Sequence, residues 1–205
     1  MADIEQGTEA WRLLRLGIPT ASRMADLMAR TKSGFGANRG NLMADLIAER
    51  LTGKPNEGFI NAAMQWGVDH EAEAIAAYEF YRDVTVERVP FVRHPLLESG
   101  ASPDCLVGED GLAEIKCPNT STHIETLLNR EIPSKYILQM QWQMVCAGRK
   151  WCDFVSFDPR MPERLRMIVI RVNRDDGKIA EMSFEVGKFL VEMNEKLENL
   201  KQLEV

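Results

Sequence analysis

Cysteine is scarce, and the few cysteines are scattered. The chain has four of them, with no Cys-x-x-Cys pair: Cys105, Cys117, Cys146 and Cys152. This number is too small for a disulfide scaffold, and the spacing favours reduced thiols in a cytosol and gives no support for a zinc site. His70 lies next to Glu71 without nearby residues that would complete a zinc set, so it is not predicted as a ligand. No role is predicted for His94 or His123.

Long apolar runs, repeats and flexible linkers are also missing. No segment approaches the roughly 18 apolar residues that a membrane-spanning helix needs, so no contact with a membrane is expected. The first residues are acidic and then amphipathic, unlike a signal peptide. No low-complexity tract or linker separates two parts of the chain. We therefore expect a cytoplasmic protein with a single domain spanning residues 1–205.

Positive charge is in deficit. Lys and Arg total 25 against 31 Asp and Glu, which gives a net charge of -6. Nucleic-acid-binding domains usually carry a basic surplus, so the total argues against such a partner. The distribution changes this interpretation, because residues 61–130 carry 12 acidic and only 5 basic residues while the remainder is near neutral. The acidic surplus belongs to one segment.

Apolar spacing predicts helices and strands in a mixed order. Helices are expected up to Gly17 and over 22–30, 41–52, 60–81, 121–130, 134–147 and about 20 residues from 179. Strands are expected over 84–94, 99–108, 111–118, 151–157 and 165–172. This order favours an α/β domain with a central mixed β-sheet flanked by helices.

Some side chains are assigned to the core and some to loops. On the predicted helix 60–81, the inward candidates are Met64, Val68, Ile75 and Tyr78. Trp66 and Trp151 are interpreted as core aromatics. Residues 31–40 are polar and glycine-rich and carry two cations, Lys32 and Arg39, so a loop is expected. This loop could contact a ligand or cover a site, but its role is left open.

The most informative fragment is Ser102-Pro103-Asp104 followed by Glu114-Ile115-Lys116. On a strand, Glu114 and Lys116 project from the same face, and Asp104 on the antiparallel neighbour can reach the same place. Two carboxylates, with the Ile115 carbonyl as a third oxygen, suit Mg²⁺. A lysine beside the metal can orient water and offset charge on a phosphate. The alternative is a surface hairpin with an ordinary ion pair, with Glu71 upstream as a solvated helix charge.

A phosphate pocket is a second hypothesis. Arg15 lies on the first helix and Ser22 near the start of the next, and a guanidinium, a hydroxyl and a helix N-terminus together bind phosphate. The alternative is that Ser22 only caps its helix while Arg15 is a solvent-exposed cation. Gln139 and Gln143 share one face of the helix 134–147, where they could bond a base edge or a backbone, or simply face solvent.

Six motifs in order give the chain a family resemblance. They are Trp11-x-x-x-Arg15-Leu-Gly-x-x-Thr20-Ala-Ser22, Trp66-Gly67-x-x-x-Glu71, Ser102-Pro103-Asp104, Glu114-Ile-Lys116-Cys-Pro118, Gln139-x-Gln141 and Asp158-Pro159-Arg160-Met161. With them the chain resembles the phage lambda-type exonucleases, or YqaJ-like viral recombinases, of the PD-(D/E)xK nuclease superfamily. The resemblance implies a restriction-endonuclease-like core and a phage or prophage origin in a bacterial host.

The resemblance also implies an activity and residue roles. The enzyme would be a Mg²⁺-dependent 5′→3′ exonuclease that digests one strand of linear double-stranded DNA to mononucleotides, leaving a 3′ overhang for recombination. Two Mg²⁺ ions, replaceable by Mn²⁺, would be held by Asp104, Glu114 and the Ile115 carbonyl, with Glu71 in or beside the site. Lys116 would serve the attacking water. The residues implied for the 5′-phosphate are Arg15, Ser22, Ser102 and Gln139.

Partners and rival functions follow from the same resemblance. A homotrimeric ring around DNA and a single-strand annealing protein are implied partners. A RecB-like or Cas4-like nuclease with an iron–sulfur cluster is a rival, but it needs four converging cysteines, usually one early in the chain. A non-catalytic DNA-end-binding scaffold and a sequence-specific restriction enzyme are further alternatives. The first is opposed by the presence of both carboxylates and the lysine.

Overall fold

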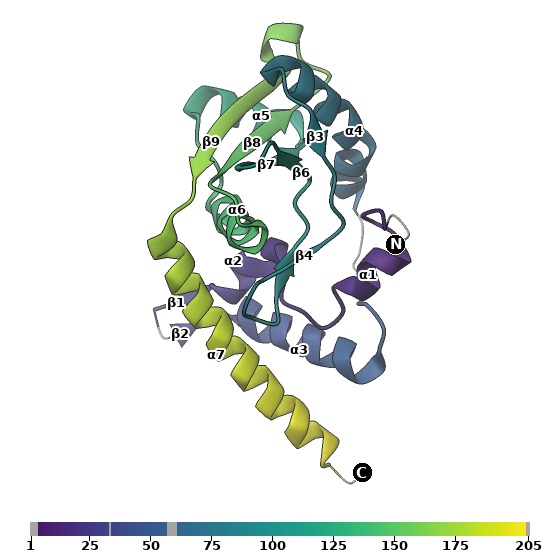
Figure 1. The fold of residues 1–205 in the computed structure, drawn as a ribbon, viewed down its shortest axis with the longest axis vertical. Helices are drawn as coiled ribbons and strands as arrows, with labels where there is room; N and C mark the ends of the chain where they lie inside the picture. Colours follow the sequence, from purple (N-terminus) through teal and green to yellow (C-terminus); the bar gives the residue numbers. More distant parts are fainter. Residues whose placement is uncertain (1–3, 33, 57–60, 204–205) are drawn as a thin grey trace.

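The computed structural model describes residues 4–32, 34–56 and 61–203, and Figure 1 shows its arrangement. Its helices are α1 (Glu9–Leu14), α2 (Met24–Leu27), α3 (Ala37–Thr52), α4 (Ala62–Arg82), α5 (Thr120–Asn129), α6 (Ser134–Ala147) and α7 (Asp176–Lys201). Its strands are β1 (Arg30–Thr31), β2 (Gly34–Phe35), β3 (Val86–Glu87), β4 (Val92–Arg93), β5 (Gly100–Ala101), β6 (Cys105–Val107), β7 (Gly111–Lys116), β8 (Trp151–Phe157) and β9 (Met167–Asn173). Two short 3-10 turns are η1 (Ala21–Arg23) and η2 (Glu163–Leu165).

The central sheet has five strands in the order β3-β6-β7-β8-β9. β7 and β8 are parallel, and the other neighbours are antiparallel. A parallel pair needs a long crossover, which α5 and α6 supply between β7 and β8. The expected mixed sheet flanked by helices is confirmed.

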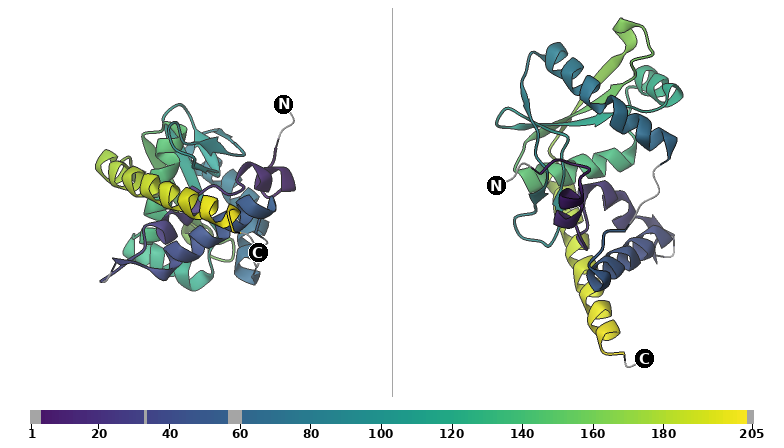
Figure 2. Two further views of the ribbon diagram at one scale, coloured as in Figure 1. Left: turned by 90° about the horizontal axis from the view of Figure 1, so that it is seen from below. Right: turned by 90° about the vertical axis from the view of Figure 1, so that its right-hand side faces the viewer.

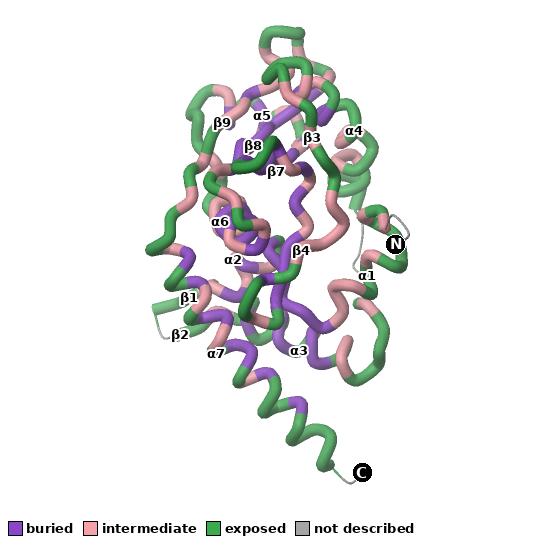
Figure 3. Tube along the Cα trace, in the orientation of Figure 1, coloured by how far each residue is buried: buried purple, intermediate pink, exposed green. Residues whose placement is uncertain are grey.

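Side-chain alternation divides the sheet into two buried faces. Odd-numbered residues such as Ile115 and Val155 pack with Ile75 and Tyr78 of α4. Even-numbered residues such as Leu112 join a separate cluster with Met140 and Met144 of α6. Both faces are therefore covered, and the tube in Figure 3 is buried along β7 and β8. Any polar side chain on the even face of β7 points at α6.

A further core lies on the side of α6 away from the sheet. Most of its buried residues come from α2, α3, α6 and α7, with Trp142 of α6 among them, and η1 and β5 add one alanine each. Figures 1 and 2 show α7 leaving the sheet and running alongside α3 toward the C-terminus. Among the described residues, no helix has a stretch long and apolar enough to cross a bilayer.

The strand predicted over 84–94 is wrong as one element. β3 pairs with β6, whereas β4 pairs with β5 in a separate two-stranded sheet. Pro90 lies between them, and the β-branched pattern runs through the break although the pairing partners change. The strand predicted over 99–108 is divided in the same way, into β5 and β6, by Pro103 and its neighbours.

Two other predictions near the N-terminus need correction. The helix expected over 22–30 is only η1 and the four-residue α2, which Met28 ends. Within the loop expected over 31–40, residue 33 lies outside the described residues, while β1 and β2 pair as antiparallel strands and the first turn of α3 follows. Gly36 is the N-cap of α3, so the helix begins four residues before the expected position 41.

The helix predicted over 60–81 has the right extent but a different buried face. Residue 60 lies outside the described residues, and α4 begins at Ala62 because Asn61 caps it by accepting a hydrogen bond from the Met64 backbone. Ile75 and Tyr78 are buried as expected. Met64 and Val68 are 54% and 66% exposed, so their assignment to the core is wrong.

Candidate active site

The even face of β7 carries an acid and a base where the other even residue is apolar. Glu114 is completely buried, whereas the Lys116 side chain is 26% exposed. Lys116 Nζ donates to Glu114 Oε1 and to the Ile115 carbonyl, the second at 3.0 Å. The lysine therefore bridges two of the oxygens that were expected to bind metal, as the spacing of two on a strand predicts.

Asp104 lies beside this pair, at the residue before β6. The register pairs Cys105 with Ala113, which brings Asp104 across from Glu114. Asp104 Oδ2 accepts a hydrogen bond from the Ile115 backbone N–H at 2.7 Å. Burial, with the nearby Glu114 carboxylate as the second cause, raises the Asp104 pKa to about 8. The alternative of a solvent-exposed hairpin ion pair is contradicted by this burial.

The charge of Lys116 responds to the same two carboxylates. Burial alone would lower its pKa, but Glu114 and Asp104 outweigh it and raise the pKa above the usual value. The ammonium is therefore the favoured form at neutral pH. It can donate hydrogen bonds and stabilise negative charge, but it cannot accept a proton in that form.

Two glutamines of α6 hold the Glu114 carboxylate. Gln139 Nε2 donates to Glu114 Oε1 and Gln143 Nε2 donates to Glu114 Oε2, each at 2.6 Å. Gln143 is buried, and Gln139 is partly buried with its amide on the carboxylate, so neither glutamine simply faces solvent as one alternative held. The structure places Gln139 at the carboxylates rather than among the residues lining the Arg15 pocket. The four-residue spacing predicts that the two glutamines share one face of the helix. Only the fold shows that this face meets the Glu114 carboxylate.

Glu71 stands at the edge of the carboxylate group. Its charge contributes to raising the Asp104 pKa, which places it within electrostatic reach. Its Oε1 accepts a hydrogen bond from Arg88 Nη2 at 2.6 Å, and its side chain is 31% exposed. The arrangement is consistent with a position beside a metal site rather than at its centre.

The donor set fits a hard divalent cation. Asp104, Glu114 and the Ile115 carbonyl offer oxygens only, and Mg²⁺ prefers few protein oxygens completed by water and phosphate. A cation between the carboxylates would relieve the repulsion that raises the Asp104 pKa. Among the described residues, no three His, Cys, Asp or Glu side chains already lie close enough together to hold a metal. The set therefore depends on two carboxylates and the backbone oxygen.

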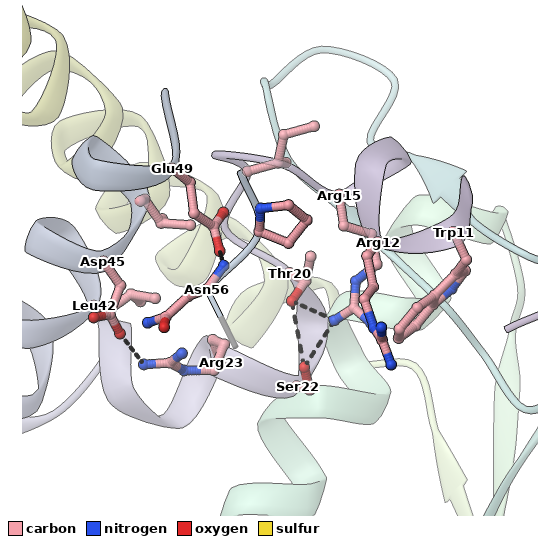
Figure 4. A pocket seen from close by; sticks show the side chains of 13 residues that line it. Trp11, Arg12, Arg15, Thr20, Ser22, Arg23, Leu42, Asp45, Glu49 and Asn56 are labelled. Carbon is pink, nitrogen blue, oxygen red and sulfur yellow. Dashed lines mark hydrogen bonds and ion pairs between the residues drawn. The ribbon is translucent and has the colours of Figure 1, made fainter. Parts of the chain in front are cut away.

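A second polar site surrounds Arg15, in a cavity of about 290 Å³ shown in Figure 4. Arg15 Nη2 donates to Thr20 Oγ1 at 3.1 Å and to Ser22 Oγ at 3.4 Å. Its guanidinium carbon lies 4.0 Å from the centre of the Trp11 ring. Burial lowers the Arg15 pKa to about 10, partly offset by Glu49. Arg15 and Ser22 are thus brought together, and the alternative of an isolated solvent cation is contradicted.

The local structure around Ser22 differs from the expectation. Ser22 lies inside the three-residue turn η1, whose N-cap is Thr20, and Arg15 is the C-cap of α1. Thr20 is held in an extended conformation by a parallel bridge to Gly100. The interpretation of Ser22 as a helix-capping residue is therefore wrong. The hydroxyls and the guanidinium remain as candidate groups for binding an anion.

Ser102 connects this cavity to the carboxylates. Trp11 Nε1 donates to Ser102 Oγ at 3.0 Å and to the Pro90 carbonyl at 2.7 Å. Ser102 does not line the cavity itself, but it is two residues before Asp104. One tryptophan thus contacts both Arg15 and the segment that carries Asp104. The two candidate sites are neighbours.

The histidines and cysteines lie in hydrogen-bonded or buried positions within the fold. His70 Nδ1 bonds the Trp66 carbonyl at 3.0 Å, and buried His123 bonds Ser156 Oγ and the Leu165 carbonyl, each at 2.8 Å. His94 Nδ1 accepts backbone N–H bonds from Leu96 and Leu97.

The four cysteines are free, buried and distributed over three separate core clusters. They form no four-cysteine ligand set, which removes the support for an iron–sulfur nuclease.

Comparisons with known proteins find similarity in sequence and in overall fold. The model of the YqaJ-like viral recombinase domain matches residues 10–150. The crystal structure of an alkaline exonuclease (LHK-Exo) from Laribacter hongkongensis is 49% identical with a TM-score of 0.89, covering 95% of this chain and 97% of that chain. The same values hold for its complex with dAMP. No curated protein matches the chain.

A more distant structure supports the fold alone. A phage-related exonuclease from Haemophilus somnus 129PT has 13% identity and a TM-score of 0.76, covering 89% of this chain and 96% of that chain. Together with the mixed sheet, these neighbours confirm the expected restriction-endonuclease-like core.

Proposed function

Because the chain belongs to the YqaJ-like viral recombinase family, we propose that it is a Mg²⁺-dependent 5′→3′ exonuclease acting on linear double-stranded DNA. The observation that carries this proposal is the convergence of Asp104, Glu114 and Lys116 on the even face of β7, beside the Arg15 cavity. The 49% identical neighbour is an alkaline exonuclease, which supports nuclease activity.

The carboxylates would bind the metal ion and fix its position. Asp104, Glu114 and the Ile115 carbonyl would hold Mg²⁺, with Glu71 beside them, and Mn²⁺ would replace it. A second Mg²⁺ ion is also expected. Oxygens of the DNA phosphate would complete the ligands of this second ion. Bound Mg²⁺ supplies charge neutralisation at the phosphate and a more acidic water. Gln139 and Gln143 would keep both oxygens of Glu114 in fixed positions through their 2.6 Å hydrogen bonds.

Lys116 would act as a cation. Its raised pKa keeps the ammonium protonated at neutral pH, so it would orient the attacking water and stabilise negative charge on the phosphate. The water oxygen forms the new bond to phosphorus, and the bond from phosphorus to the 3′ oxygen of the terminal nucleotide breaks. The products are a 5′-mononucleotide with a free 3′ hydroxyl and a shortened strand that again begins with a 5′-phosphate.

The Arg15 cavity would receive that 5′-phosphate. The Arg15 guanidinium with the Thr20 and Ser22 hydroxyls provides donors for its oxygens, and Ser102 lies next to them through Trp11. Since each cut regenerates a 5′-phosphate, the same cavity could hold the strand after every step. The complex of the similar alkaline exonuclease with dAMP, a mononucleotide, supports this type of product.

Assembly and partner are part of the same proposal. The net charge of the chain is -6, so it has no basic surplus to attract DNA. A homotrimeric ring around the DNA would keep the protein bound without such a surplus. The 3′ overhang would pass to a single-strand annealing protein for recombination. Light scattering should give three times the mass of one chain at micromolar concentration, and a monomer in the presence of DNA would contradict the ring.

The test of the activity uses three DNA substrates with Mg²⁺. Linear 5′-phosphorylated duplex should be digested fast, linear 5′-hydroxyl duplex slowly, and closed circular duplex not at all. Cutting of the circle would indicate an endonuclease. Binding of linear ends without digestion would indicate a non-catalytic scaffold.

A further inference from the structure

A stack of planar side chains joins the end of β8 to the beginning of α4. The Asp158 carboxylate, fully buried one residue after β8, accepts hydrogen bonds from Arg160 Nε at 2.7 Å and Arg160 Nη2 at 2.9 Å. Thr120 Oγ1 donates to the same carboxylate at 2.7 Å. Such a bidentate pair fixes the orientation of the guanidinium plane as well as its position.

That guanidinium lies over Trp66. Its central carbon lies 4.1 Å from the centroid of the ring, which is a cation–π contact. The His70 ring stacks on Trp66 with 3.6 Å between centroids and 25° between planes. The residue after His70 is Glu71. The chain of contacts therefore runs from Asp158 to the residue next to the outermost carboxylate of the candidate active site.

The first half of α4 has few other anchors. The buried residues of this helix are Ala74, Ile75 and Tyr78, all after Glu71. Before Glu71, Met64 and Val68 are more than half exposed. Trp66 is the residue of this half that packs against the core cluster formed by α4 and the sheet. The Trp66 ring therefore anchors the half of the helix that precedes Glu71, while Arg88 holds the Glu71 carboxylate itself.

We propose that Arg160 is a positioning residue for the metal site: held by Asp158, it fixes Trp66 and His70, and through them it keeps the Glu71 carboxylate beside Asp104 and Glu114. Arg160 touches neither substrate nor metal in this role. The inference rests on the proposed function, because it assigns Glu71 to a magnesium site. It predicts that Arg160 contributes to metal affinity from outside the ligand set, in the way that outer partners orient metal ligands.

The competing role is a direct contact with DNA. The Arg160 side chain is 46% exposed, and an exposed guanidinium can bind a phosphate. The two roles separate cleanly in experiment. A positioning residue changes the affinity for Mg²⁺ in the absence of DNA, whereas a phosphate contact changes the KM for DNA and leaves metal binding unchanged.

The fold contains a matched control. At the other end of β8, Asp153 holds Arg171 with hydrogen bonds of 2.8 and 3.0 Å, and the Arg171 guanidinium lies 3.6 Å from the Trp151 ring centroid. Arg171→Gln thus breaks the same kind of pair and the same kind of stack. It does so at the opposite end of the strand, away from Glu71.

The experiment measures Mg²⁺ binding to the full-length protein by calorimetry without DNA, followed by kcat and KM on linear duplex at several Mg²⁺ concentrations. Arg160→Gln should weaken Mg²⁺ binding by about tenfold, the lower end of the effect of outer partners. Arg160→Lys, which keeps the charge beside Asp158 but loses the planar stack, should weaken it as well. Arg171→Gln should bind Mg²⁺ like the wild type.

Trp66→Phe supplies the rescue variant. Among the described residues Trp66 Nε1 has no hydrogen-bond partner, so phenylalanine keeps a stacking face without losing a bond, and Mg²⁺ affinity should stay within about twofold of wild type. If both Arg160 variants bind Mg²⁺ normally and raise only the KM for DNA, the positioning role is overturned. If wild-type protein neither binds Mg²⁺ nor digests linear duplex, the proposed function itself fails.

Discussion

The hydrogen bond from Gln143 to Glu114 gives a quantitative test of the candidate site. Gln143→Leu removes a 2.6 Å donor from a carboxylate that is completely buried. A hydrogen bond to a charged group contributes roughly 1.5–3 kcal/mol to stability. Gln143 Oε1 is itself buried without a partner among the described residues, so its removal returns part of that cost. The free energy of unfolding should fall by about 1.5–2 kcal/mol.

The assay is urea unfolding of the metal-free protein, followed by circular dichroism at neutral pH. A double-mutant cycle with Glu114→Gln separates the interaction between Gln143 and the carboxylate from general packing effects, because this variant removes the charge of the acceptor and keeps its size. The coupling free energy should be at least about 1 kcal/mol. A loss of stability below about 0.5 kcal/mol for Gln143→Leu, with no coupling, would refute the role of Gln143 in holding the carboxylate.

Three further perturbations test other parts of the structure. Arg15→Gln should erase most of the preference for a 5′-phosphate over a 5′-hydroxyl end while Arg164→Gln keeps it, and an unchanged rate ratio would contradict the phosphate cavity. Gly111→Ala should lower the free energy of unfolding by about 1–3 kcal/mol in a denaturation curve, because a Cβ there would overlap with the Trp151 ring; a curve like that of wild type would contradict this close packing. The Asp104 pKa is raised to about 8 in the folded state, above its unfolded value near 4, so the metal-free protein should lose stability as pH rises from about 5 to 8. Asp104→Asn should remove this slope, and a wild type whose stability rises over that range would contradict the burial of the carboxylate.

Regular apolar spacing within a helix or strand is enough to predict some elements from the sequence alone. The helix over 134–147 has the expected bounds because its apolar spacing is regular and Gly148 ends it in a left-handed conformation. The contact between Glu114 and Lys116 follows from the two-residue period of a strand. These features need only the sequence within one element.

Features that depend on a distant partner were missed or misassigned. Gln143 reads as a polar residue on a helix face, and nothing near it in the chain shows that β7 places Glu114 opposite. Val92 continues the alternation of Val86, yet it pairs with Ala101 rather than with β6. In both cases the tertiary pairing decides the structure, and one sequence does not contain that information in local form.

The most direct measurement of the central claim follows the first nucleotide released from linear duplex. With Mg²⁺ and a label on the 5′-phosphate, wild-type protein should release the label as a mononucleotide at the earliest times. Asp104→Asn and Lys116→Gln should release none while remaining folded, and Asp110→Asn, an exposed acid in the turn between β6 and β7, should act like the wild type. Release of labelled mononucleotide by Asp104→Asn at the wild-type rate would contradict the assignment of the active site.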